Sequence, residues 1–95
     1  MSGSTLELQH YLDEQGRVCT WPSKRHRNKQ RAVLRYLVLQ FEPHRRYREA
    51  EVNALLNQHH TFHDPALLRR EMFDHQLMDR ERNGSAYWRM DESEI

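Results

Sequence analysis

Residues 64–90, DPALLRREMFDHQLMDRERNGSAYWRM, decide the fold, because they join a capped helix to a tight hairpin. Asp64 followed by Pro65 predicts a helix start, since an Asp side chain caps free amides and a proline ring is pre-set to helical φ. Further along, Asn83-Gly84 accepts the two positive φ angles of a type I′ turn at low cost. The stretch therefore predicts a helix followed by a β-hairpin.

The elements of this stretch have clear inner faces. We expect the helix to span Pro65 to about His75 and the two strands to span Leu77–Glu81 and Ala86–Met90. Side chains alternate across a strand, so one of Tyr87 and Trp88 should face the core and the other the solvent. Helical spacing turns these residues of the helix inward: Leu68, Met72 and Phe73.

Two more helices precede this stretch. Ser23 is a plausible cap for a long helix that reaches about Gln40, where Pro43 blocks continuation. A second helix spans roughly Arg48 to His59. Apolar residues at helical spacing form the inner stripes of both helices. They are Leu34, Leu37, Val38 and Phe41, widened by Val33, Tyr36 and Leu39, and then Val52, Leu55, Leu56 and His59.

The N-terminal part adds one short helix and one extended stretch. Ser4 and Glu7 fit a capping box for a helix from Thr5 to about Asp13. Gly16 ends that helix, and Arg17–Trp21 has the pattern of a short extended stretch. We expect one domain over residues 1–95, with an N-terminal helix and strand in 4–22, a core in 23–90 and a flexible tail in 91–95.

This order of elements is that of a winged helix. The expected class is α+β, mainly helical, with a three-helix core, a C-terminal β-hairpin and an additional short N-terminal helix. Winged helices commonly bind nucleic acid, and they also serve as protein contact modules. The order of elements therefore indicates architecture more sharply than activity.

Motifs spread along most of the chain suggest a family. In order, they are Tyr11-Leu12-Asp13, Gly16-Arg17, Trp21-Pro22, Leu34-Arg35-Tyr36-Leu37, Phe41, Tyr47, Glu51-Val52-Asn53, Leu68-Arg69-Arg70-Glu71, Gly84 and Tyr87-Trp88. With these motifs the chain resembles, from Tyr11 to Trp88, the bacterial family called domain of unknown function 2087.

That resemblance implies a link to transcription and no catalytic residues. Members of the family occur alone or attached to helix-turn-helix transcriptional regulators. The chain departs from the family pattern at Arg48, where a Ser or Thr is expected to cap the second helix. Either that cap is missing or the helix starts differently.

Composition limits the possible functions. The 95 residues are 37% hydrophobic and 31% charged, with a net charge of only +1. Nonspecific DNA binders usually carry a clear positive excess, so nucleic-acid binding requires local clustering of charge. A single cysteine, Cys19, and the lack of a long apolar run favour a cytoplasmic protein that does not enter a membrane.

The densest basic cluster is Lys24-Arg25-His26-Arg27-Asn28-Lys29, with Arg31. Cations in the first turn of a helix oppose its dipole, which indicates a phosphate partner, although a solvated helix end is the ordinary alternative. On the third helix, Arg69 should pair with Glu51 or Asp79, whereas Arg70 points outward. Glu71 and Asp74 share the face of Arg70 and argue against sequence reading by this helix.

Our preferred hypothesis is a transcription-associated domain that binds nucleic acid through a basic helix end and the wing. The residues expected to make contact are Lys24, Arg25, Arg27, Lys29, Arg70 and Arg82. In the rival hypothesis, the third helix and wing contact a regulatory protein or a second copy of the chain, without direct DNA binding.

Other classes of function find little support. His59, His60 and His63 suggest a metal site, but they lie at a turn where Asp64 is needed as a cap, and a packed neutral imidazole is the ordinary role of His59. No Gly-rich phosphate loop and no paired carboxylates occur. We therefore expect no enzyme activity, no cofactor and no metal.

Overall fold

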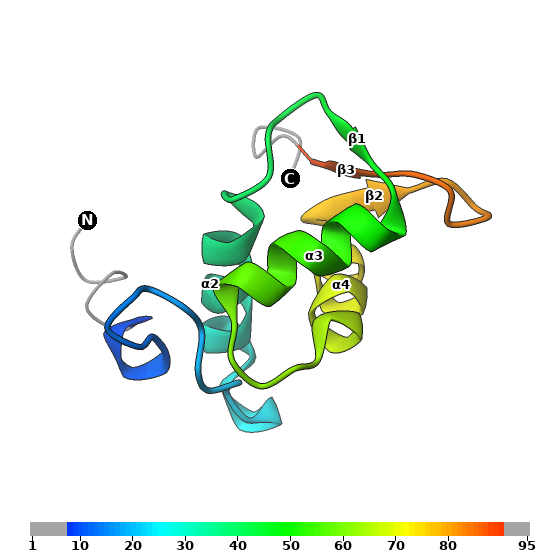
Figure 1. Ribbon diagram of the computed structural model, residues 1–95. Coiled ribbons are helices and arrows are strands. Elements are labelled where there is room, and N and C mark those ends of the chain that lie inside the picture. Colours follow the sequence, from blue (N-terminus) through cyan, green and yellow to red (C-terminus); the bar gives the residue numbers. More distant parts are fainter. Residues whose placement is uncertain (1–7, 91–95) are drawn as a thin grey trace.

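The structure, a computed structural model, describes residues 8–90 as helices followed by a small sheet (Figure 1). The predicted Ser4–Glu7 capping box and the predicted tail over 91–95 lie outside the described residues. In chain order the elements are the 3₁₀ turns η1 (Gln9–Tyr11) and η2 (Lys24–His26), helix α2 (Arg27–Val38), strand β1 (Arg46–Tyr47), helices α3 (Glu49–His59) and α4 (Pro65–Asp74), and strands β2 (Met78–Arg80) and β3 (Tyr87–Arg89).

Helix α2 supplies the centre of the core. The predicted stripe is confirmed, since Leu34, Leu37 and Phe41 are at most 1% exposed. Burying each of these side chains contributes about 1.5–3 kcal/mol. The prediction that Leu39 widens the stripe is wrong, because Leu39 is 60% exposed and lies on the outer side of α2.

Helix α3 begins after Arg48, whose side chain makes no capping hydrogen bond, as expected where the family pattern has Ser or Thr. The Arg48 backbone amide instead donates to the carboxylate of Glu51 at 2.8 Å, which is the reciprocal half of a capping box. This hydrogen bond is the largest cause that lowers the pKa of Glu51. Val52 and Leu56 of α3 are buried against α4 and the sheet.

Helix α4 starts as predicted. The Asp64 carboxylate accepts from the Leu67 amide at 3.1 Å, and Pro65 occupies the first helical position. The helix ends at Asp74, one residue before the predicted end. Gln76 has a φ of 63°, so the chain turns there toward β2.

The sheet has three antiparallel strands in the order β1-β3-β2. Strand β1 was not predicted, because two residues carry no periodicity of their own and pair only with distant β3: Arg46 faces Trp88 and Tyr47 faces Tyr87. Tyr87 is buried and Trp88 is half-buried beneath the Arg46 guanidinium, so the predicted alternation is confirmed.

The hairpin is confirmed, but its predicted turn type is wrong. A type I′ turn needs positive φ at both Asn83 and Gly84, and only Gly84, with φ of 75°, has it. The Gly84 amide donates to the Glu81 carbonyl and the Glu81 amide to the Ala86 carbonyl, both at 2.9 Å. Residues 82–85 thus form a four-residue loop whose corner positions are Arg82 and Asn83.

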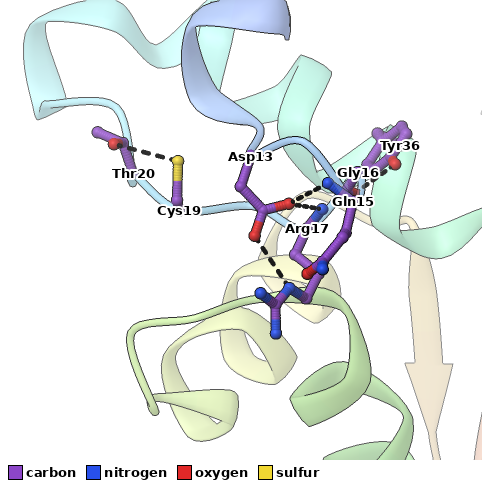
Figure 2. Close-up of polar contacts among 7 residues, drawn as sticks. All are labelled: Asp13, Gln15, Gly16, Arg17, Cys19, Thr20 and Tyr36. Carbon is purple, nitrogen blue, oxygen red and sulfur yellow. Dashed lines mark hydrogen bonds and ion pairs between the residues drawn. The ribbon is translucent and has the colours of Figure 1, made fainter.

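The N-terminal segment lies against α2 through a tight loop. Helical structure stops at Tyr11, not at the predicted Asp13, because the Asp13 carboxylate accepts from the Gln15 and Arg17 backbone amides, each at 2.9 Å, and holds a turn (Figure 2). The Tyr36 hydroxyl of α2 donates to the Gly16 carbonyl at 2.6 Å. The predicted extended stretch is present at Val18, which bridges Leu12 and His60.

Three helices followed by a three-stranded antiparallel sheet with a C-terminal hairpin form a winged-helix-like fold of the α+β, mainly helical class, as predicted. Within residues 8–90, the helices are too short and too polar to cross a membrane.

Candidate nucleic-acid interface

The basic segment at the start of α2, residues 24–29, is here called the basic turn. The predicted side-chain cap from Ser23 is wrong: the Ser23 side chain makes no capping hydrogen bond, and its carbonyl accepts from the His26 amide at 2.9 Å in the 3₁₀ turn η2. Regular α-helix begins only at Arg27. Buried Gln30 fixes the turn in place, since its Nε2 donates to the Pro22 carbonyl at 2.8 Å.

Four cations of the basic turn project from this anchored segment. Lys24, Arg25 and Arg27 are exposed, and Lys29 is half-buried. With the residues that the structure describes, none of the four makes a hydrogen bond or an ion pair. Their charges are therefore available to a partner.

The basic turn approaches the C-terminal end of α4. Arg31, one turn after Arg27, donates to the His75 carbonyl at 2.9 Å. Burial lowers the pKa of His75, and the nearby charges of Arg27 and Arg31 lower it further against the opposing effects of Glu71 and Asp74. The charge of Arg27, in the basic turn, thus contributes to lowering the pKa of His75, the residue that follows α4.

Helix α4 presents an exposed stripe of Ala66, Arg70 and Asp74. Glu71, predicted to share this face, is instead only 23% exposed and lies 3.6 Å from the His75 ring. Of the two carboxylates that argued against sequence reading, only Asp74 therefore remains exposed. A groove of about 320 Å³ separates α4 from the hairpin; it is lined by Glu49, Ala66, Arg69, Arg70, Phe73, Arg80 and Tyr87.

Arg69 and Arg70 have opposite roles. Arg69, 19% exposed, bonds Asn53 and lies 3.6 Å from Glu49, so the expectation of a structural role is met but the predicted partners Glu51 and Asp79 are wrong. Tyr87 also donates to Glu49, at 3.4 Å, which ties α3, α4 and β3 together. Arg70 makes no such contact within residues 8–90.

Strand β2 and the hairpin loop carry two further arginines, of which Arg82 is a predicted contact residue. Arg80 stacks on the Phe73 ring of α4, 4.7 Å from its centroid, and both side chains line the α4–hairpin groove. Arg82 is exposed in the 82–85 loop and makes no ion pair or hydrogen bond with the described residues.

All fifteen Lys and Arg residues can now be sorted by contact. Nine interact with other groups of the protein; for eight of them the partners are carboxylates, carbonyls, side-chain amides or aromatic rings. These engaged cations are Arg17, Arg31, Arg35, Arg45, Arg46, Arg48, Arg69, Arg80 and Arg89. The six left over, called the free cations, are the residues predicted to contact nucleic acid: Lys24, Arg25, Arg27, Lys29, Arg70 and Arg82.

The acidic side chains divide very differently. Within residues 8–90, most carboxylates cap a helix, accept a backbone amide or contact a basic side chain. Only Glu14 and Asp74 lack such a contact among these residues. Within residues 8–90, cations without such a contact therefore outnumber carboxylates without one.

The free cations form two groups rather than one cluster. Figure 1 shows η2, in cyan, at the foot of α2 and the hairpin loop of residues 82–85, in orange, at the right edge of the molecule. Helix α4 lies against α2, which follows η2, and against β2 of the hairpin. Arg31 of α2 donates to the His75 carbonyl just after α4, and the hairpin lines the groove beside Arg70.

The histidines at the α3–α4 turn are arranged by packing. His60, not the predicted His59, is the buried imidazole; its Nδ1 donates to the Leu56 carbonyl at 2.7 Å and its Nε2 accepts from the Asp64 amide at 2.9 Å. Both ring nitrogens are thus occupied. Within residues 8–90, no group of three His, Cys, Asp or Glu side chains is placed to hold a metal ion.

Comparison with known proteins identifies the family. The model of DUF2087, described as an uncharacterized protein conserved in bacteria, matches residues 17–89. No curated protein and no solved structure matches the chain. Since the matched residues make up most of the sequence, the chain belongs to the DUF2087 family.

Proposed function

We propose that this DUF2087 domain binds double-stranded DNA in a transcription-associated role, with α4 in the major groove and with the basic turn and hairpin loop on the phosphates. The observation that supports this most strongly is the sorting of the cations. Nine of the fifteen contact other parts of the fold, whereas the six that remain make no hydrogen bond or ion pair with residues 8–90 and lie in the basic turn, on α4 and in the hairpin loop.

The dimensions of α4 suit this role. Ala66 and Asp74 are eight residues apart, so the exposed stripe extends for about 12 Å along the helix axis. With its side chains an α-helix is about 10–12 Å in diameter, which fits the major groove of B-form DNA, about 12 Å wide. The major groove of A-form RNA is too narrow, so DNA is the favoured duplex.

The basic turn then supplies affinity rather than sequence preference. Lysine and arginine side chains bind phosphates by charge, and each neutralised phosphate releases a counterion. Because Arg82 and the basic turn lie on different sides of α4, they can contact separate stretches of the phosphate backbone and fix the orientation of α4.

Fluorescence anisotropy with a labelled 20-base-pair duplex at low salt tests the proposal. The variant K24Q/R25Q/R27Q should bind at least about tenfold more weakly than the native chain. The matched control Q9E/H10E/Q15E changes the net charge by the same three units at exposed N-terminal positions and should bind nearly as well.

Equal weakening by both variants would mean that binding follows net charge alone, against the proposal. No binding of the native chain to any duplex, together with a dimer in light scattering, would instead support the rival function as a protein contact module.

A further inference from the structure

Arg70 and Asp74 lie one turn apart on the exposed stripe of α4, yet they do not pair. Opposite charges at positions i and i+4 are neighbours on a helix and ordinarily attract each other. Here no ion pair joins them, and neither makes a hydrogen bond through its side chain to any residue from 8 to 90. Both side chains are exposed and available.

Asp74 is exceptional among the carboxylates near α4. Glu49 contacts Arg69 and Tyr87, and Glu71 lies against His75, whereas Asp74 is exposed and follows Arg70 by one turn of α4. A carboxylate on a DNA-facing surface repels phosphates and lowers affinity. That cost is offset where the carboxylate accepts a hydrogen bond from a base, and in the major groove the natural donor is cytosine N4.

We infer that Arg70 and Asp74 form a base-reading pair that selects duplexes containing guanine and cytosine, Arg70 binding guanine O6 and N7 and Asp74 accepting from cytosine N4. This inference rests on the proposed DNA binding. The four-residue spacing corresponds to about 6 Å along the helix, close to two base-pair steps of about 3.4 Å, so the two bases are about two steps apart when α4 follows the groove.

The experiment selects bound duplexes from a library with a randomised centre, using the native chain and the variants D74N, D74A and R70A. The native chain should prefer cytosine about tenfold at one position. D74A should lose that preference. D74N should transfer it to adenine, because an amide pairs with adenine N6 and N7. R70A should lose the guanine preference at the position about two steps away and keep the cytosine preference.

Glu14→Gln provides the matched control, since Glu14 is the other exposed carboxylate without a contact in residues 8–90 and lies in the N-terminal segment. This variant should reproduce the native sequence profile. Circular dichroism on every variant confirms that the fold is retained.

Two results would overturn the inference and leave DNA binding intact. In the first, D74A binds all duplexes more tightly with an unchanged sequence profile, so that Asp74 merely repels phosphate. In the second, the native profile is flat although a fixed duplex binds in a salt-dependent way. If the native chain binds no duplex at all, the proposed function fails first and the inference falls with it.

Discussion

Two basic segments of similar composition differ in whether their Lys and Arg side chains have partners within the fold. In the basic turn, residues 24–29, no Lys or Arg has a partner among residues 8–90. Around β1, each arginine of residues 45–48 has one: Arg45 lies near Glu42 and Glu51, Arg46 pairs with Glu81 and covers Trp88, and Arg48 lies near Glu51.

This difference shows that a run of positive charge in a sequence does not by itself indicate whether the charges stabilise the fold or bind a partner. What decides it is the placement of carboxylates, which tertiary structure brings from distant positions such as Glu81. A segment whose arginines are neutralised supports the fold, and a segment without such neighbours presents charge to a partner. The predictions below test this division between engaged and free charges.

The adjacent residues Arg69 and Arg70 give the largest contrast. Replacing Arg69 with Ala leaves half-buried Asn53 without this partner and removes the ion pair with half-exposed Glu49, and should lower the free energy of unfolding by about 2 kcal/mol. Arg70→Ala should change it by less than about 0.5 kcal/mol. Urea denaturation measures both, and similar losses in the two variants would contradict the division.

The two basic segments give the next contrast. R45Q/R46Q/R48Q should cost about 1–2 kcal/mol of unfolding free energy, because exposed ion pairs are each worth less than about 1 kcal/mol. K24Q/R25Q/R27Q should cost nothing or stabilise slightly, because it removes cations near the start of α2, where the helix dipole disfavours them. Urea midpoints of the two triple variants provide the comparison. A larger loss of unfolding free energy in the basic-turn variant would contradict the division between engaged and free charges.

The aspartates at the two ends of α4 allow the same comparison between an engaged and a free carboxylate: Asp64 is the N-terminal cap and Asp74 is the last residue of the helix. Asp64→Ala should cost about 1 kcal/mol of unfolding free energy, because it removes the N-terminal cap that accepts from Leu67. Asp74→Ala should leave stability within about 0.5 kcal/mol of the native value. Thermal and urea unfolding of both variants should rank them in this order; the reverse order would show that Asp74 is engaged.

His75 gives a pH-dependent effect. Its pKa is lowered from the ordinary 6.5, mainly by burial, so near this pH the unfolded chain binds more protons than the folded chain. Stability should therefore be fully present above pH 6.5 and decrease as pH falls below it. In urea midpoints from pH 7.5 to 5.5, His75→Gln should weaken this dependence, whereas His63→Gln, at an exposed site, should not. An unchanged slope in H75Q would assign the effect elsewhere.

Local patterns were sufficient to predict most of the fold. Helical spacing located Leu34, Leu37 and Leu68 in the core, and Asp64-Pro65 and Asn83-Gly84 marked a helix start and a hairpin, because each signal acts over a few residues. Strand β1 escaped prediction, since its two residues are defined only by pairing with β3, about forty positions later.

The candidate site could be predicted only in part for the same reason. Exposure of the basic turn follows from its lack of apolar residues. The partners of Arg69 and the burial of His60 in place of His59 depend on how α3 meets α4. The contrast between engaged and free charges is likewise a tertiary property, which net charge cannot show.

The salt dependence of duplex binding is the most direct test of the claim that the five free cations of the basic turn and hairpin loop face phosphate. If all five contact phosphates, a plot of log K against log salt concentration should fall with a slope of about −4.5, and K24Q/R25Q/R27Q should reduce its magnitude by about 3. A slope near zero in the native chain, or the same slope in both proteins, would contradict the claim.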